Sequence, residues 1–166
     1  MDYLEKAKRV IALEMDELQR LSDRLAEPFC AAIDAMKMAI ELQRKIVVVG
    51  VGKSGNIGHK IAATLNSTGA TAVVLNSQNA LHGDLGLVKS GDVVLAMSQS
   101  GETSELLDLL PYLRRSEVTI IGMTGNPESS LGRHGDIVLH TGVDREACPL
   151  NLAPTSSSTV MLVLGD

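Results

Sequence analysis

The chain has 166 residues, of which 45% are hydrophobic and only 2% aromatic, and its formal net charge at pH 7 is -5. This length suits one domain, whose core must consist of aliphatic side chains and Met packed between layers. The acidic balance excludes a broad basic face for nucleic acid, and the charged first residues exclude a signal peptide or membrane span, so we expect a cytoplasmic protein with neither nucleic-acid nor membrane partners.

Apolar residues recur at steps of three and four from residue 2 to about residue 44, which predicts helix, and Pro28 divides this stretch into two helices. Residues 46–50 then form a continuous apolar run, which is typical of a strand buried on both faces. Similar runs follow at residues 71–75, 93–97, 118–123 and 137–139, and helices are expected at 55–67, 104–115 and from 155 onward. The alternation predicts an α/β fold, a three-layer α/β/α sandwich with a five-stranded parallel sheet and ligand sites beyond the carboxyl ends of the strands.

The segment GVGKSG after the first strand has the glycine spacing of a dinucleotide site. No acidic residue stands about 20 positions on to hold a ribose, and Val47 occupies the place of the first P-loop glycine, so we expect no nucleotide cofactor. The remaining features are the free N–H groups of a tight turn at Gly52 and Ser54 and the cation of Lys53, which suit a single phosphate or the polar end of a sugar. The alternative is an ordinary turn with an exposed lysine.

Two serine-rich loops also precede predicted helices. The first follows the third strand and offers Ser98, Ser100, Gly101 and Thr103; the second introduces the last helix with Thr155 and Ser156 in a run of hydroxyls. Hydroxyls and free N–H groups at a helix N-terminus can bind a phosphate dianion without arginine. Each loop alone is equally consistent with an ordinary helix cap, but together they predict one phosphate site.

The first serine loop resembles the SxSGxT phosphate loop of the sugar isomerase (SIS) domains. Within that family, the segments HGDLG (82–86) and EACPLNLAPTSS (146–157) are similar to those of the arabinose 5-phosphate isomerases, and the likeness runs from about residue 45 to 166. The segment at 76–79 departs from the more usual Pro-Gly-Glu type. Such isomerases continue with a His-Pro-Gly-Gly segment, whose histidine is expected to act in catalysis, and often with a pair of CBS domains. The resemblance therefore implies that residues 1–166 are one SIS domain of flavodoxin-like fold that is cut short at its C-terminus.

The resemblance implies an aldose–ketose isomerase that interconverts ribulose 5-phosphate and arabinose 5-phosphate through an enediol, which is general acid–base chemistry. The implied catalytic residues are Lys53, which would stabilise the developing enediolate, together with Glu105 and Glu146, whose acid and base roles stay undivided. His82 is a further candidate for contact with sugar hydroxyls, or an adventitious metal ligand, although one His beside one Asp is not a metal site. Cys30 and Cys148 stand far apart and indicate neither a disulfide framework nor a zinc site.

The N-terminal helices carry apolar stripes that a five-stranded sheet need not cover, which favours a homodimer or homotetramer. Two other functions stay open: a non-catalytic domain that senses a phosphosugar, and an isomerase of another phosphosugar. The resemblance implies that the product feeds either lipopolysaccharide Kdo synthesis or capsule assembly.

Overall fold

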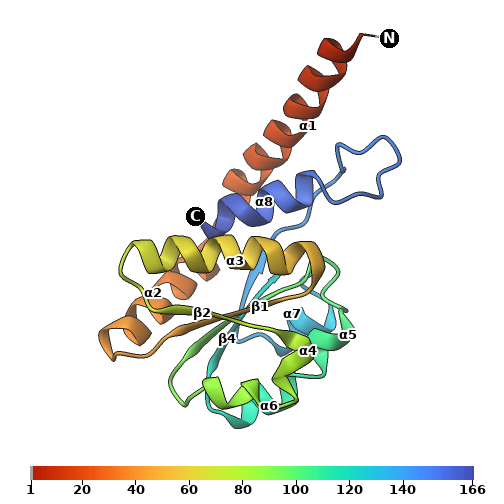
Figure 1. The fold of residues 1–166 in the computed structure, drawn as a ribbon. Helices are drawn as coiled ribbons and strands as arrows, with labels where there is room; N and C mark the ends of the chain where they lie inside the picture. Colours follow the sequence, from red (N-terminus) through yellow and green to blue (C-terminus); the bar gives the residue numbers. More distant parts are fainter. Residues whose placement is uncertain (1) are drawn as a thin grey trace.

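The computed structural model describes residues 2–166 and contains one five-stranded sheet with helices on both faces (Figure 1). The strands are β1 (Ile46–Gly50), β2 (Ala72–Leu75), β3 (Val93–Met97), β4 (Thr119–Thr124) and β5 (Ile137–His140). Every neighbouring pair is parallel, and the strand order is β2-β1-β3-β4-β5. The predicted three-layer α/β/α sandwich with a five-stranded parallel sheet is therefore confirmed.

The central strands are buried on both faces, which explains why they are apolar without interruption. In β1, Ile46 and Val48 pack into one core cluster, whereas Val47 and Val49 pack into the cluster on the opposite face. All four side chains are fully buried. Successive strand residues point to opposite faces, so only a sheet covered on both sides can bury such a run.

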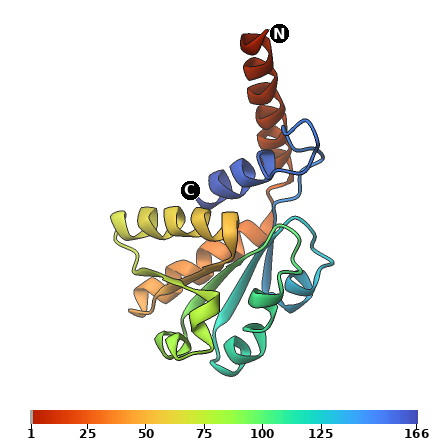
Figure 2. The same cartoon turned by 45° about the vertical axis from the view of Figure 1, so that its right-hand side comes forward.

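The helices divide between the two faces of the sheet. One face is covered by α2 (Glu27–Glu41), α3 (Gly52–Ser67) and α8 (Ser156–Gly165). The short helices α4 (Ser77–Ala80), α5 (Ser104–Leu107), α6 (Leu110–Arg115) and α7 (Ser130–His134) lie on the other face, where the 3-10 helix η1 (Asp84–Leu87) also packs. Helix α1 (Tyr3–Arg24) extends away from the sheet, and both views show its first turns clear of the other elements (Figures 1 and 2).

The predicted helices agree with the observed ones at the N-terminal break and differ from them at α3 and after β3. Pro28 lies in the first turn of α2, so the predicted division of the N-terminal stretch is confirmed. Helix α3 begins at Gly52 rather than at residue 55, which places Lys53 and Ser54 in its first turn. The single helix predicted over 104–115 is two helices, because Pro111 lacks an N–H group and lies in the first turn of a new helix, α6.

Among residues 2–166, none of the helices combines the length and the apolar character that a membrane crossing requires.

Candidate functional site

A cleft of about 240 Å³ opens beyond the carboxyl ends of β1 and β3, the two strands between which the strand order reverses. Its walls come from the start of α3, the loop after β3 and the start of α8. The lining residues are Val51, Lys53, Ser54, Ile57, Gln99, Pro154, Ser157, Ser158 and Met161. In open parallel sheets, the crevice at such a reversal is where ligands bind.

The first wall is the turn from β1 into α3. A Cβ atom on Gly50 would lie 2.9 Å from the nitrogen of Gly55, and one on Gly55 would lie 2.8 Å from the oxygen of Gly50. Only glycine at both positions allows strand and helix to approach so closely. Lys53 is exposed at this end of the helix and has no side-chain hydrogen bond or ion pair with residues 2–166, so its ammonium group is available to a ligand.

The loop after β3 brings the predicted phosphate-binding hydroxyls together. The Ser98 hydroxyl lies 2.7 Å from that of Thr103 and 3.5 Å from that of Ser100. The backbone N–H of Gly101 donates to the Ser98 hydroxyl at 3.0 Å, and Gly101 adopts a φ of 69°. The four residues therefore form one polar turn that ends at the start of α5.

Gln99 lies in the same loop and reaches the cleft wall, although the sequence analysis did not select it. Its amide is fixed to Thr141, which follows β5: the Thr141 hydroxyl donates to Gln99 Oε1 at 3.2 Å, and Gln99 Nε2 donates to the Thr141 carbonyl at 3.4 Å. This pairing joins loops 42 residues apart, so no local pattern could have indicated it.

Glu146 lies at the N-terminus of α8, where its carboxylate accepts hydrogen bonds from two residues. Thr155 donates its N–H at 2.7 Å and its hydroxyl at 3.0 Å, and Ser157 donates its N–H at 3.2 Å and its hydroxyl in a further, short bond. Burial acts to raise the pKa of Glu146, but the hydrogen bonds from Ser157 and Thr155 outweigh burial and hold that pKa below its usual value. Because Ser157 also lines the cleft, the Glu146 anion lies directly behind the cleft wall.

The last serine run contributes residues that differ from the two expected ones. Ser157 and Ser158 line the cleft, whereas Thr155 lies beside Glu146 as described. The hydroxyl of Ser156 is fully buried and has no hydrogen-bond partner among residues 2–166. The run itself indicated this helix start, but successive helical residues point about 100° apart, and the sequence does not show which of them face the cleft.

The predicted residues of the loop after β3, Ser98, Ser100, Gly101 and Thr103, do not line this cleft themselves, and the loop reaches it through Gln99. Glu105, His82 and Gly52 do not line it either. Glu105 is exposed in α5, where hydrogen bonds from its own backbone N–H and from the Ser104 hydroxyl hold its pKa below the usual value. His82 is exposed in the turn between α4 and η1. Gly52 lines a neighbouring cleft of about 270 Å³ beside β2 instead. Among residues 2–166, no three or more His, Cys, Asp or Glu side chains form a group that could hold a metal ion.

Comparison with known proteins identifies the family of this chain. Residues 39–166 match the SIS domain family. The chain is 48% identical over 166 residues to the arabinose 5-phosphate isomerase KdsD of Pseudomonas aeruginosa, covering 100% of this chain and 50% of that protein. It is 45% identical to KdsD of Yersinia pestis with the same two coverages. The chain thus spans about half the length of these curated relatives.

A solved structure of an Escherichia coli CFT073 protein in complex with arabinose 5-phosphate superposes with a TM-score of 0.88. The two chains share 38% sequence identity, and the match covers 100% of this chain and 88% of the other. The family match extends over most of the chain, and the relatives match it from end to end. The predicted resemblance is therefore confirmed, and the chain belongs to the SIS domain family.

Proposed function

We propose that this chain is the isomerase domain of an enzyme that interconverts D-ribulose 5-phosphate and D-arabinose 5-phosphate. The observation that carries the proposal is the cleft at the strand-order reversal, where Lys53, Ser54 and Ser157 meet and Glu146 lies behind Ser157. The relatives named KdsD, at 45–48% identity, and the structural relative in complex with arabinose 5-phosphate support the choice of a five-carbon sugar phosphate.

In this proposal, the hydroxyls and N–H groups at the starts of α3, α5 and α8 bind the phosphate and the sugar hydroxyls. A base removes a proton from carbon 1 of ribulose 5-phosphate, which gives an enediolate over carbons 1 and 2, and return of a proton to carbon 2 gives arabinose 5-phosphate. Lys53 provides the positive charge that stabilises the enediolate oxygen. Glu146 is hydrogen-bonded to Ser157, which lines the cleft, whereas Glu105 is exposed and bonds to Ser104, so Glu146 is the better candidate for proton transfer.

The other functions considered from the sequence are less well supported. A phosphosugar sensor without catalysis and an isomerase of a different phosphosugar would both use the same phosphate loop. The curated relatives matching at 45–48% identity are named as arabinose 5-phosphate isomerases, which favours the five-carbon reaction over both alternatives.

The test is incubation of the protein with ribulose 5-phosphate, followed by chromatographic identification of the product. Arabinose 5-phosphate should accumulate to an equilibrium mixture. Fructose 6-phosphate and sedoheptulose 7-phosphate serve as competing substrates. Faster turnover of either would reassign the enzyme, and binding without turnover of any of the three would support a sensor.

We also propose that the protein forms a homo-oligomer through α1. Leu4, Ile11 and Met15 on this helix are 63%, 59% and 62% exposed, an apolar surface that water solvates poorly. Burying it against another copy would remove that cost. Sedimentation should show a dimer or tetramer, and Ile11→Asp should shift it toward the monomer. A wild-type protein that sediments as a monomer at micromolar concentration would contradict the assignment.

We further propose that the enzyme acts in the cytoplasm. Cys30 and Cys148 are both free thiols, which suits a reducing compartment. Cell fractionation with an antibody against the protein tests the assignment.

A further inference from the structure

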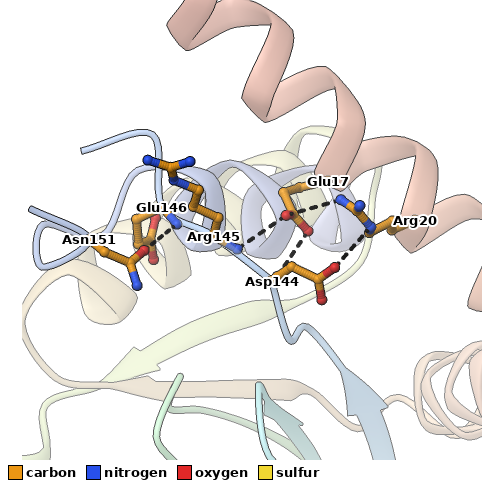
Figure 3. Close-up of polar contacts among 6 residues, drawn as sticks. All are labelled: Glu17, Arg20, Asp144, Arg145, Glu146 and Asn151. Carbon is orange, nitrogen blue, oxygen red and sulfur yellow. Dashed lines mark hydrogen bonds and ion pairs between the residues drawn. The ribbon is translucent and has the colours of Figure 1, made fainter. Parts of the chain in front are cut away.

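Glu17 is a buried acidic residue on a helix that is otherwise largely exposed. Its side chain is only 3% accessible to solvent, and burial of a carboxylate is costly unless hydrogen bonds compensate for the lost water. The compensating donors are the backbone N–H groups of Asp144 and Arg145, each at 3.2 Å, and Arg20 Nη1 at 3.3 Å (Figure 3). The two backbone donors are 127 and 128 positions away in the chain.

The two oxygens of Glu17 bind different residues. Oε2 accepts from Asp144, and Oε1 accepts from Arg145. Arg20 adds a second link, because its Nε lies 3.2 Å from Asp144 Oδ2 while its Nη1 contacts Glu17. Helix α1 therefore holds the segment after β5 at two consecutive backbone positions.

The very next residue is Glu146. Its backbone N–H donates to Asn151 Oδ1 at 2.7 Å, and its carboxylate binds Thr155 and Ser157 at the start of α8. The segment 144–146 is thus fixed at one end by Glu17 and at the other by α8. A shift at Asp144 or Arg145 would move the Glu146 carboxylate relative to Ser157 and the cleft.

We propose that Glu17 is a positioning residue of the isomerase: it fixes the backbone of Asp144 and Arg145 and thereby holds the Glu146 carboxylate beside the cleft. The role rests on the proposed function, in which Glu146 takes part in proton transfer. Misplacement of a reacting group by about 1 Å can cost about 10²-fold in rate, so a residue that fixes such a group acts strongly without touching the substrate.

The charged side chains around Glu17 balance one another. Two carboxylates, Glu17 and Asp144, face two guanidinium groups, Arg20 and Arg24. Burial lowers the pKa of Arg24, while the charges of Glu17 and Asp144 act to raise it. Arg24 Nε and Nη2 are buried and have no hydrogen-bond partner among residues 2–166, so the charge of Glu17 matters to Arg24 as well.

The experiment compares Glu17→Gln with Glu14→Gln. Glu17→Gln would replace one acceptor oxygen with an NH₂ group that faces a backbone N–H. One of the two hydrogen bonds from Asp144 and Arg145 would therefore be lost, while the size of the side chain stays the same. Glu14 lies on the same helix, but its carboxylate accepts from the Thr159 hydroxyl of α8 at 2.9 Å and is not bonded to segment 144–146. The same substitution at Glu14 therefore controls for general effects on the packing of α1.

We expect Glu17→Gln to lower kcat by roughly 10- to 100-fold while KM changes less than about threefold, because the phosphate loops are untouched. The pKa of Glu146, followed by carbon-13 NMR of labelled glutamate, should move up as its bonds to Thr155 and Ser157 weaken. Glu14→Gln should alter neither quantity. An unchanged kcat and Glu146 pKa in folded Glu17→Gln, or equal losses in Glu14→Gln, would overturn the proposal.

Two further measurements keep the outcomes distinct. If Glu17→Gln does not fold, Glu17→Asp retains the charge but falls one methylene short of spanning both N–H groups, and it should show the same split between kcat and KM. If the wild-type protein does not isomerise ribulose 5-phosphate, the proposed function fails, while the NMR comparison still decides whether Glu17 holds Glu146.

Discussion

Hydroxyl groups around Ser98 are the main candidates for recognition of the phosphate. The Ser98, Ser100 and Thr103 hydroxyls lie within one turn, and a phosphate dianion would replace their mutual contacts with charge-assisted hydrogen bonds, which are about twice as strong as neutral ones.

We predict that replacing Ser98 and Ser100 together by alanine weakens binding of arabinose 5-phosphate by at least about tenfold, since each charge-assisted bond is worth roughly 1.5–3 kcal/mol. Binding of unphosphorylated arabinose should hardly change. Isothermal titration with both sugars measures the two affinities. Equal losses for both ligands would show that these serines do not contact the phosphate.

Asp92 stabilises the end of the sheet away from the cleft. It is 1% exposed and accepts from Lys45 Nζ at 2.6 Å, from the N–H of Lys45 at 3.2 Å and from the N–H of Lys89 at 2.8 Å. Burial acts to raise the pKa of Asp92, but these hydrogen bonds outweigh it and hold the pKa below its usual value. A depressed pKa in the folded state means that the carboxylate stabilises the protein above about pH 4 and that this contribution is lost as the pH falls through the folded-state pKa.

Asp92→Asn should therefore lower the free energy of unfolding by about 2–3 kcal/mol at pH 7, because an amide donor would face buried donors. The difference from wild type should shrink as the pH drops below about 4. Urea unfolding over pH 3–7 measures both effects. Asp108 is exposed and makes none of these contacts, so Asp108→Asn is the matched control. It should change the free energy of unfolding by less than about 0.5 kcal/mol. If Asp92→Asn lost the same free energy of unfolding at every pH, the ionised Asp92 carboxylate would not be the source of the stabilisation.

At the scale of the elements, the loop after β3 depends on its packing against α7. Gly101 has a φ of 69°, and a Cβ atom there would lie 1.9 Å from the Ser129 hydroxyl oxygen. Ser129 is buried and caps α7 by accepting from the N–H of Gly132. Neither side of this contact has room to move, so the loop holds its shape only with glycine at this position.

We predict that Gly101→Ala costs at least about 2 kcal/mol of stability and weakens sugar-phosphate binding, because both backbone strain and overpacking oppose it. Gly86→Ala is the matched control, since its added Cβ atom would meet nothing within 4 Å and its φ is not positive. Thermal unfolding and titration with arabinose 5-phosphate compare the two. Similar behaviour of both variants would refute this account of the loop.

The elements that could be predicted are those whose apolar residues form a clear pattern, either a continuous run or a regular spacing. Continuous aliphatic runs indicated all five strands to within one or two residues, and Pro28 marked the break between α1 and α2. Helix α3 begins at Gly52, three residues before the predicted start. Gly52 has a positive φ, and a glycine-rich segment by itself indicates a loop rather than the first turn of a helix. The four-residue helix α4 is set by hydrogen bonds from Gln78 and Asn79 to the Asn76 side chain, a local signal too short to stand out.

At the scale of the whole molecule, the site depends on the order of the strands. The alternation of strands and helices along the chain predicts a parallel sheet, but it does not indicate which strands are neighbours. The observed order places the loops after β1 and β3 side by side, and α8 then closes the cleft against α3. The contacts of Gln99 with Thr141 and of Glu17 with the segment before Glu146 span 42 and 127 positions, so only the fold reveals them.

Isomerisation of ribulose 5-phosphate in heavy water tests the central claim, that this cleft carries out enediol chemistry on a sugar phosphate. Wild-type protein should give arabinose 5-phosphate that carries deuterium at carbon 2. Lys53→Gln should slow this exchange by at least about 100-fold, whereas Lys60→Gln should leave it near the wild-type rate, since Lys60 is on the same helix but pairs with Asp166 outside the cleft. Absence of both product and deuterium with the wild-type protein, or exchange in Lys53→Gln as fast as in wild type, would contradict the account.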